Sequence, residues 1–299
     1  MLLGTNAAAM RADSIELVLV KCRVFHKSPV RAEDVCNPTI ALGNLSHVRS
    51  QPHSCARNLE LCDSVDAAET ELAGLGNAIL VETGNGDALL LDQLAARLAR
   101  SNTTLLLGRQ PGAGGQQPVG LVGEIELSGG FLPAQATAAL DLSRECGGAP
   151  VLFAATRGFD LQDLRVLSEL VVAAAVPTTV CMLAGIWHDP LLYQAAFVSN
   201  NFLLVVDPRG YGLDSELEDC QLAERCLPLL QQECARFVLG IHFSHAVQLR
   251  RYGGDGYLHT AKRFLSRLRM LGASPNELEG LCKTNALKAL QYRQPIVQG

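Results

Sequence analysis

Short apolar runs alternate with amphipathic segments along most of this chain, and this alternation limits the folds open to it. Eight runs have the length and the flanking Gly, Pro or polar residues of buried strands: Thr39–Ser46, Asn77–Thr83, Thr103–Gly108, Val119–Glu126, Ala149–Ala154, Thr178–Leu183, Phe202–Asp207 and Arg236–His242. Several runs are apolar without interruption, as expected for strands with helices over one face and a packed interior behind the other.

Segments with apolar residues at helical spacing lie between these runs. The expected helices are Cys62–Leu75, Ala88–Arg100, Pro133–Cys146, Leu161–Ala174, Ser215–Glu233, Tyr257–Leu271 and Pro275–Leu290. The last one has the clearest start, because Ser274 can cap it, Pro275 takes its first position, and Glu277 completes a capping box.

Eight strands alternating with helices over about 250 residues predict an α/β fold of the (β/α)8 TIM-barrel type. The barrel is expected at residues 39–299, with residues 1–38 as a short N-terminal extension that has a strand of its own at Ser14–Val20. A doubly wound open sheet fits the same alternation, but the count of eight favours the barrel.

Charge and composition exclude several classes of partner. The chain has 25 basic and 30 acidic residues, a net charge of −5, which argues against nucleic acid or an anionic membrane as the main partner. No segment approaches the ~18 apolar residues of a membrane span, and Met1–Ala9 lacks the charged start of a secretory signal. We therefore expect a cytoplasmic protein whose ten cysteines are reduced and serve as small buried hydrophobes.

Lysine is scarce, and its distribution excludes several enzyme classes. None of the five lysines lies between residues 28 and 261. A P-loop needs a Gly-Lys-Ser/Thr sequence after a strand, and Schiff-base enzymes and protein kinases need a lysine in the core. The middle of the chain provides neither, and it has no Gly-x-Ser-x-Gly sequence for a serine hydrolase.

Residues 250–259, Arg-Arg-Tyr-Gly-Gly-Asp-Gly-Tyr-Leu-His, and the helix-forming segment 263–290 closely resemble the end of the phosphotriesterase-related family of the amidohydrolase superfamily. Residues 58–72, 120–133 and 204–210 resemble further segments of that family in the same order. The resemblance implies a (β/α)8 barrel with two metal ions at the carboxyl ends of the strands. Such metals turn a bridging water into hydroxide and polarise a phosphoryl or carbonyl oxygen.

The family's metal ligands are a His-x-His on the first strand, a bridging carboxylate on the fourth, a histidine on each of the fifth and sixth, and an aspartate on the eighth. At these positions the resemblance places His47, Arg49, Glu124, Ala154, Leu183 and His242, in that order. Arginine cannot ligate a metal, because its guanidinium group stays protonated. The loop at 109–118 is also shorter than the segment that covers the substrate in the family.

Two functions follow from this incomplete ligand set. In the first, the chain is a pseudoenzyme without a cofactor, a structural or interaction subunit that binds a protein partner or joins a multi-subunit assembly. An Arg49–Glu124 ion pair then replaces the metals, and Ala154 and Leu183 fill the emptied pocket with apolar volume.

In the second, His47, Glu124 and His242 hold zinc or another divalent metal, with His245 as a proton carrier. The chain is then a hydrolase of ester, phosphoester or amide bonds. The first function explains more of these residues. A third possible function is binding of a small molecule in the pocket that holds the active site in the family. No feature of the sequence supports it.

Overall fold

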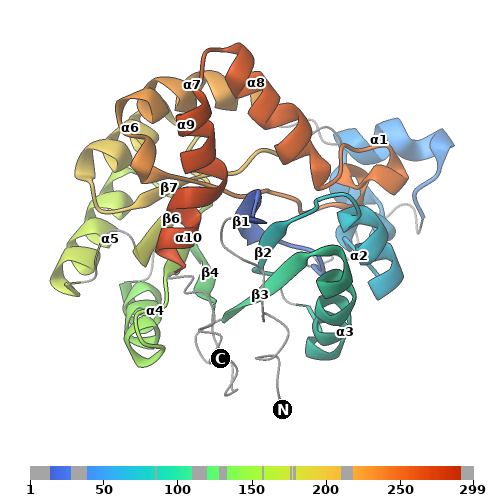
Figure 1. The fold of residues 1–299 in the computed structure, drawn as a ribbon, viewed down its shortest axis with the longest axis horizontal. Helices are drawn as coiled ribbons and strands as arrows, with labels where there is room; N and C mark the ends of the chain where they lie inside the picture. Colours follow the sequence, from blue (N-terminus) through green and yellow to red (C-terminus); the bar gives the residue numbers. More distant parts are fainter. Residues whose placement is uncertain are drawn as a thin grey trace.

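A computed structural model describes residues 14–27, 39–84, 86–109, 120–127, 133–156, 158–175, 177, 180–209 and 218–290. Its centre is one sheet of eight strands, each parallel to the next, in sequence order (Figure 1). The strands are β1 (Leu17–Cys22), β2 (Ala78–Glu82), β3 (Thr103–Arg109), β4 (Leu121–Leu127), β5 (Val151–Ala155), β6 (Cys181–Ala184), β7 (Leu203–Val206) and β8 (Phe237–Leu239). The predicted (β/α)8 barrel is confirmed.

The barrel closes between its last and first strands. Just beyond β8, the backbone N–H of Ile241 donates a hydrogen bond to the carbonyl of Lys21 in β1, at 2.8 Å. The carboxyl ends of both strands therefore lie together at the same end of the barrel, which is where functional residues gather in this architecture.

Helices surround the sheet (Figure 1). They are α1 (Leu45–Ser50), α2 (Val65–Leu72), α3 (Ala88–Leu98), α4 (Pro133–Glu145), α5 (Leu161–Ala173), α6 (Pro190–Ser199), α7 (Asp219–Gln232), α8 (Leu265–Met270), α9 (Pro275–Glu279) and α10 (Asn285–Ala289). A π-helical turn at Thr260–Phe264 precedes α8, and another at Gly280–Thr284 joins α9 to α10. The predicted Ser274–Glu277 capping box is confirmed at the start of α9.

Helix α6 was not predicted from the sequence, although its start carries a standard signal. Asp189 caps this helix by accepting a hydrogen bond from the N–H of Leu191, and Pro190 occupies its first turn. Both are residues that favour a helix start.

Two apolar layers hold the barrel together. Side chains such as Val18, Ile79 and Val205 pack inside it, whereas their neighbours Leu19 and Leu80 pack outward against the helices. Alternation along each strand assigns the two layers, because successive side chains point to opposite faces. This explains the uninterrupted apolar runs in the sequence.

The first strand is not where the sequence analysis placed it. Leu17–Cys22 is fully buried and pairs with β2, so this strand belongs to the barrel and not to an extension ending at residue 38. The predicted strand Thr39–Ser46 instead forms a 3-10 turn at Leu42–Asn44 and the start of α1. The physical reason is burial: a parallel barrel strand needs apolar residues on both faces, which Leu17–Cys22 has, whereas Ser46 and His47 are exposed.

Two other expectations concern segments with limited description. Apart from Arg109, the loop expected to be short (109–118) lies outside the described residues, as do the first three residues of the helix expected at Ser215–Glu233.

None of the helices in the described ranges has the length and apolar character needed to cross a membrane. The cysteines within these ranges are all free thiols.

Candidate functional site at the mouth of the barrel

A buried lysine stands at the centre of the barrel mouth. The Nζ atom of Lys21 lies 2.7 Å from Oδ2 of Asp207, 3.0 Å from Nδ1 of His242 and 3.4 Å from Oε1 of Glu124. Its side chain is only 2% exposed. Two of its three N–H groups thus have a hydrogen-bond partner, and the nearby Glu124 carboxylate adds an ion pair, so the buried charge is compensated.

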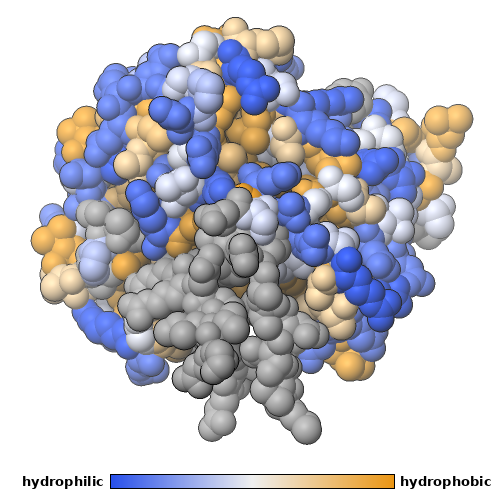
Figure 2. All heavy atoms as spheres, viewed as in Figure 1, coloured by the Kyte–Doolittle hydropathy of each residue, from blue (hydrophilic) through white to orange (hydrophobic). Residues whose placement is uncertain are grey.

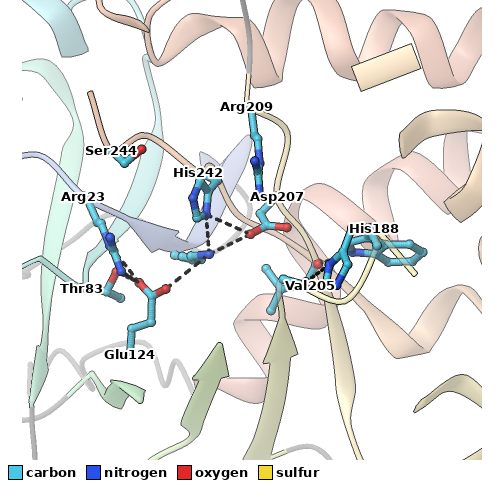
Figure 3. A network of polar contacts seen from close by, with 12 residues as sticks. Arg23, Thr83, Glu124, His188, Val205, Asp207, Arg209, His242 and Ser244 are labelled. Atoms are coloured by element: carbon cyan, nitrogen blue, oxygen red, sulfur yellow. Dashed lines mark hydrogen bonds and ion pairs between the residues drawn. The ribbon is translucent and has the colours of Figure 1, made fainter. Parts of the chain in front are cut away.

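Arg23 extends this network on the side of β4. Its Nε donates to Oε2 of Glu124 at 3.1 Å, and its Nη2 donates to Glu126 at 2.8 Å. The hydroxyl of Thr83 donates to the same Glu124 oxygen at 3.2 Å. Figure 3 shows Arg23, Glu124, Asp207 and His242 converging from different strands. We call Lys21, Arg23, Glu124, Asp207 and His242 the ion-pair cluster.

A local irregularity in β1 lets Lys21 reach the interior. The register of β1 against β2 shifts between Leu19 and Cys22. Val20 packs inside the barrel, and Cys22 packs outside it, against the helices. One extra residue, Lys21, therefore stands on the inner side between them, which is the effect of a β-bulge. After Cys22, the side chain of Arg23 again points to the inner side, where it contacts Glu124.

The cluster holds both carboxyl groups ionised. Burial alone would raise the pKa of Glu124, but the charges of Lys21 and Arg23 lower it to about 2. Burial opposes ionisation of Asp207 as well, and there chiefly the Lys21 charge brings the pKa below its usual range. Two positive and two negative side chains thus compensate one another in a site with little water.

The same cluster holds His242 neutral. Burial, and after it the Lys21 charge, lower the pKa of His242 to about 4. Since the Lys21 ammonium can only donate, Nδ1 of His242 accepts this hydrogen bond, and the ring proton resides on Nε2. His242 therefore presents an N–H donor on the side opposite Lys21.

Of the residues predicted for the site, Glu124 and His242 do lie together, but His47 and Arg49 do not lie on a strand. Both are on α1, where His47 is exposed and Nη2 of Arg49 donates to the carbonyl of Gly253 at 3.1 Å. Glu124 is paired with Lys21 and Arg23 in place of Arg49. The predicted ion pair thus has the right kind of partner but the wrong residue, because the first strand was placed too late in the chain.

The prediction that Ala154 and Leu183 both point into the emptied pocket is correct only for Ala154. Ala154 lies in the barrel interior, but Leu183 packs in the outer layer under the helices. Its neighbour Ala184 has the inward position, next to Ala154 across the β5–β6 register. The alternation of side chains along β6 explains this error of one residue.

His245 does not serve the proton-carrying role expected of it. It is 9% exposed, its Nδ1 lies 2.8 Å from the hydroxyl of Ser244, and burial together with His53 lowers its pKa to about 3. A histidine with that pKa is neutral and exchanges protons poorly near neutral pH.

The residues at the barrel mouth do not fit a two-metal centre. At the carboxyl end of β1, the spacing of a His-x-His is filled by Lys21-Cys22-Arg23, two permanent donors that cannot ligate a metal and that repel a dication. Their partners are Glu124 and Asp207, the carboxylates a metal would need. Within the described ranges, no three or more His, Cys, Asp or Glu side chains are grouped so that they could hold a metal ion.

A cavity of about 350 Å³ opens beside the cluster, over the ends of β5 to β8. Asp207, Arg209 and His242 line one side, and Trp187 and His188 from the β6–α6 loop line another. Trp187 is the only tryptophan of the chain; it is buried, and its Nε1 donates to the carbonyl of Val205 at 2.7 Å. Figure 3 shows His188 across from Asp207 and His242. Trp187 is thus part of the cavity wall.

Lys21, Arg23 and Asp207 were not predicted for the site, although the sequence carries a signal for all three. Lys21 and Arg23 directly follow the apolar run Leu17–Val20, and Asp207 directly follows the run at the end of β7. A charged residue at the carboxyl end of a buried barrel strand is a candidate for the site.

No protein-family model matches the chain, and a search of curated proteins finds no match. Solved structures do match over nearly the whole chain. A resiniferatoxin-binding protein from Rhodobacter sphaeroides has a TM-score of 0.80 at 21% identity, over 96% of this chain and 94% of that one. A phosphotriesterase homology protein from Escherichia coli, complexed with phosphate in its active site, has a TM-score of 0.68 at 16% identity, over 93% and 100% of the two chains.

An amidohydrolase from Mycoplasma synoviae is also similar, with a TM-score of 0.67 at 13% identity, over 94% of this chain and 89% of that one. Identities this low establish the fold and leave activity open. The chain has the (β/α)8 barrel fold of the phosphotriesterase-related proteins of the amidohydrolase superfamily.

Proposed function

We propose that this chain is a non-catalytic barrel of the phosphotriesterase-related type, in which the ion-pair cluster replaces the metal site, and that it acts as a structural or interaction subunit in a protein assembly. The observation that carries the proposal is the Lys21 ammonium group held between Asp207, Glu124 and His242. It supplies from within the chain the positive charge that metal ions supply in a metallohydrolase.

The cluster has no group poised to activate a water molecule. Lys21 donates to Asp207 and contacts His242, and it forms an ion pair with Glu124, which also accepts from Arg23 and Thr83. A general base needs a pKa near the working pH, whereas the pKa of Glu124 is about 2 and that of His242 about 4. These groups stabilise one another more readily than they move protons.

An interaction role is supported by the outer surface. Large apolar side chains are exposed on two neighbouring helices: Leu191 (64%) and Val198 (80%) on α6, and Val172 (63%) on α5. In Figure 2 hydrophobic residues lie among hydrophilic ones at the left edge of the face shown, over these helices. Exposed apolar groups on adjacent elements are typical of surfaces that bind other proteins.

The alternative is a zinc-dependent hydrolase of ester, phosphoester or amide bonds that uses His47, Glu124 and His242. Nothing in the described geometry favours it, because His47 is exposed on α1 and Glu124 is already paired with two cations.

The test is hydrolysis with and without added metal. Purified protein is assayed with paraoxon, a γ-lactone and p-nitrophenyl acetate, in the presence of zinc, manganese or cobalt, next to the Glu124→Gln variant. The proposal expects rates equal to the blank for both proteins. Metal-stimulated turnover that is lost in Glu124→Gln would contradict it and support the hydrolase.

A further inference from the structure

The cavity beside the ion-pair cluster contains a positive charge that the cluster does not use. Arg209 follows β7 and lines this cavity. Its backbone is fixed, since its N–H donates to Asp219 at 2.9 Å and its carbonyl accepts from Gln248 at 3.0 Å. In the part of the chain that the structure describes, no ion pair or hydrogen bond involves the Arg209 guanidinium group. It can therefore bind a ligand without breaking an internal contact.

A second donor faces the same space. The Lys21 ammonium fixes the proton of His242 on Nε2, and the His242 side chain is 27% exposed, on the cavity side. Arg209 lies close enough for its charge to act on His242, and Figure 3 shows the two side chains next to each other. One acceptor group in the cavity could thus receive hydrogen bonds from both.

The other charges that line the cavity are already compensated. Asp207 is paired with Lys21, and Asp219 accepts the Arg209 N–H through one oxygen and contacts Nε2 of His259 through the other. These two carboxylates would still disfavour a ligand with two negative charges, because like charges repel strongly where water is scarce. The charge balance therefore fits a single negative charge.

Apart from the polar Thr156 and His188, the rest of the lining is apolar or aromatic. Ala155, Leu222 and Trp187 face the cavity, with Gly158 and Gly185 leaving room between them. At about 350 Å³ the cavity falls in the range of small-molecule sites, which combine apolar walls with a few placed polar groups.

From these contacts we infer that the cavity binds a small organic monocarboxylate, with its carboxylate between Arg209 and Nε2–H of His242 and its apolar body against Trp187. This inference rests on the proposed ion-pair cluster, because Lys21 sets the position of the His242 proton. Ligand binding then gives the barrel a means of sensing a metabolite, with no reaction required.

Trp187 provides the measurement, because it is the only tryptophan and it lines the cavity. Benzoate and hexanoate are titrated against the full chain while its fluorescence is followed, with benzamide and inorganic phosphate as comparisons. We expect saturable 1:1 binding of a carboxylate, with benzamide weaker by about 10-fold to 100-fold because it lacks the charge-assisted hydrogen bonds. The Arg209→Gln variant should weaken benzoate binding by a similar factor, and Arg165→Gln, on the exposed side of α5, should leave it unchanged.

Three results would overturn the inference: no saturable binding of either carboxylate at millimolar concentration, equal affinity for benzoate and benzamide, or tighter binding of inorganic phosphate. Unchanged benzoate affinity in Arg209→Gln would remove Arg209 as the anchor and overturn it as well. Failure of the proposed cluster appears separately, as bound metal or metal-stimulated hydrolysis, and neither depends on benzoate.

Discussion

The ammonium group of Lys21 lies 2.7 Å from Oδ2 of Asp207, and the two residues are separated by 186 positions in the chain. The contact joins the first strand of the barrel to the residue just after the seventh. Because both side chains are almost fully buried, leaving either charge without the other would cost several kcal/mol of folding free energy. This pair is therefore expected to stabilise the folded barrel, and it engages a carboxylate that a metal ion would need.

Replacing Lys21 by methionine should strongly destabilise the protein. The change keeps the length of the side chain but leaves Glu124 and Asp207 buried without their shared cation. Breaking a buried pair in this way costs about 3–5 kcal/mol. Urea unfolding followed by circular dichroism measures the change. The same substitution at the exposed Lys262 is the control, expected to stay within about 0.5 kcal/mol; a Lys21→Met loss as small as that would contradict the role given to the pair.

Stability should fall steeply below pH 4.5. The pKa of Glu124 is about 2 in the folded protein against an ordinary 4.5, so the unfolded chain binds a proton that the folded chain excludes. The stabilisation is complete above pH 4.5 and is lost as the pH falls toward 2, and Asp207 acts in the same direction.

The stability of the protein below pH 4.5 reports on Glu124 most clearly. Between pH 4.5 and 6.5, His242 and Glu82 act in opposite directions, because the pKa of His242 is lowered to about 4 and burial raises that of Glu82 to about 8. Urea midpoints measured from pH 5 downward in wild type and in Lys21→Met test the assignment. The variant should show a shallower acid dependence, since Lys21 is the main cause that lowers the Glu124 pKa; equal slopes would contradict this.

The buried thiols should resist alkylation in the native protein. Burial raises the pKa of Cys181 and Cys226 to about 12, and the thiolate is the form that reacts. Peptide mass spectrometry after a short exposure to iodoacetamide should find both unmodified, whereas the half-buried Cys146 is labelled. In urea all three should react. Labelling of Cys226 as fast as Cys146 in the native state would contradict the burial of Cys226 on α7.

Most of the barrel could be predicted from periodicity. The strands from β2 to β8 lie close to their expected positions, because buried parallel strands have uninterrupted apolar runs with polar ends. The helices from α2 onward follow their apolar spacing, except α6. That helix, Pro190–Ser199, is apolar on most of its surface, so it lacks the polar face that marks an amphipathic helix.

The site could be predicted only in part. Glu124 and His242 followed from the resemblance to the family's ligand positions, and the need of Glu124 for a cationic partner followed from the cost of an unpaired buried charge. The sequence did not predict which residue is that partner. The apolar runs predict the first strand at Thr39–Ser46, and the resemblance then places His47 and Arg49 at its ligand positions, whereas the more apolar Leu17–Val20 belongs to β1.

Local sequence patterns could not predict the ion pair between Lys21 and Asp207 across the barrel. Lys21 and Asp207 each end an apolar run, yet nothing within either run indicates that the two ends meet. Only the closure of the sheet between β8 and β1 brings them together. The β-bulge that turns Lys21 inward is equally invisible, because strict alternation from Val18 and Val20 would point Lys21 outward.

The central claim, that Lys21 and Arg23 replace two metal ligands, is tested most directly by zinc titration calorimetry on wild type and the Lys21→His/Arg23→His double variant. The variant restores a His-x-His beside Glu124 and His242, and imidazole and carboxylate groups are the ligands zinc prefers. We predict no stoichiometric zinc binding by wild type and a new site in the variant. Stoichiometric zinc in wild type, lost on Glu124→Gln, would contradict the claim.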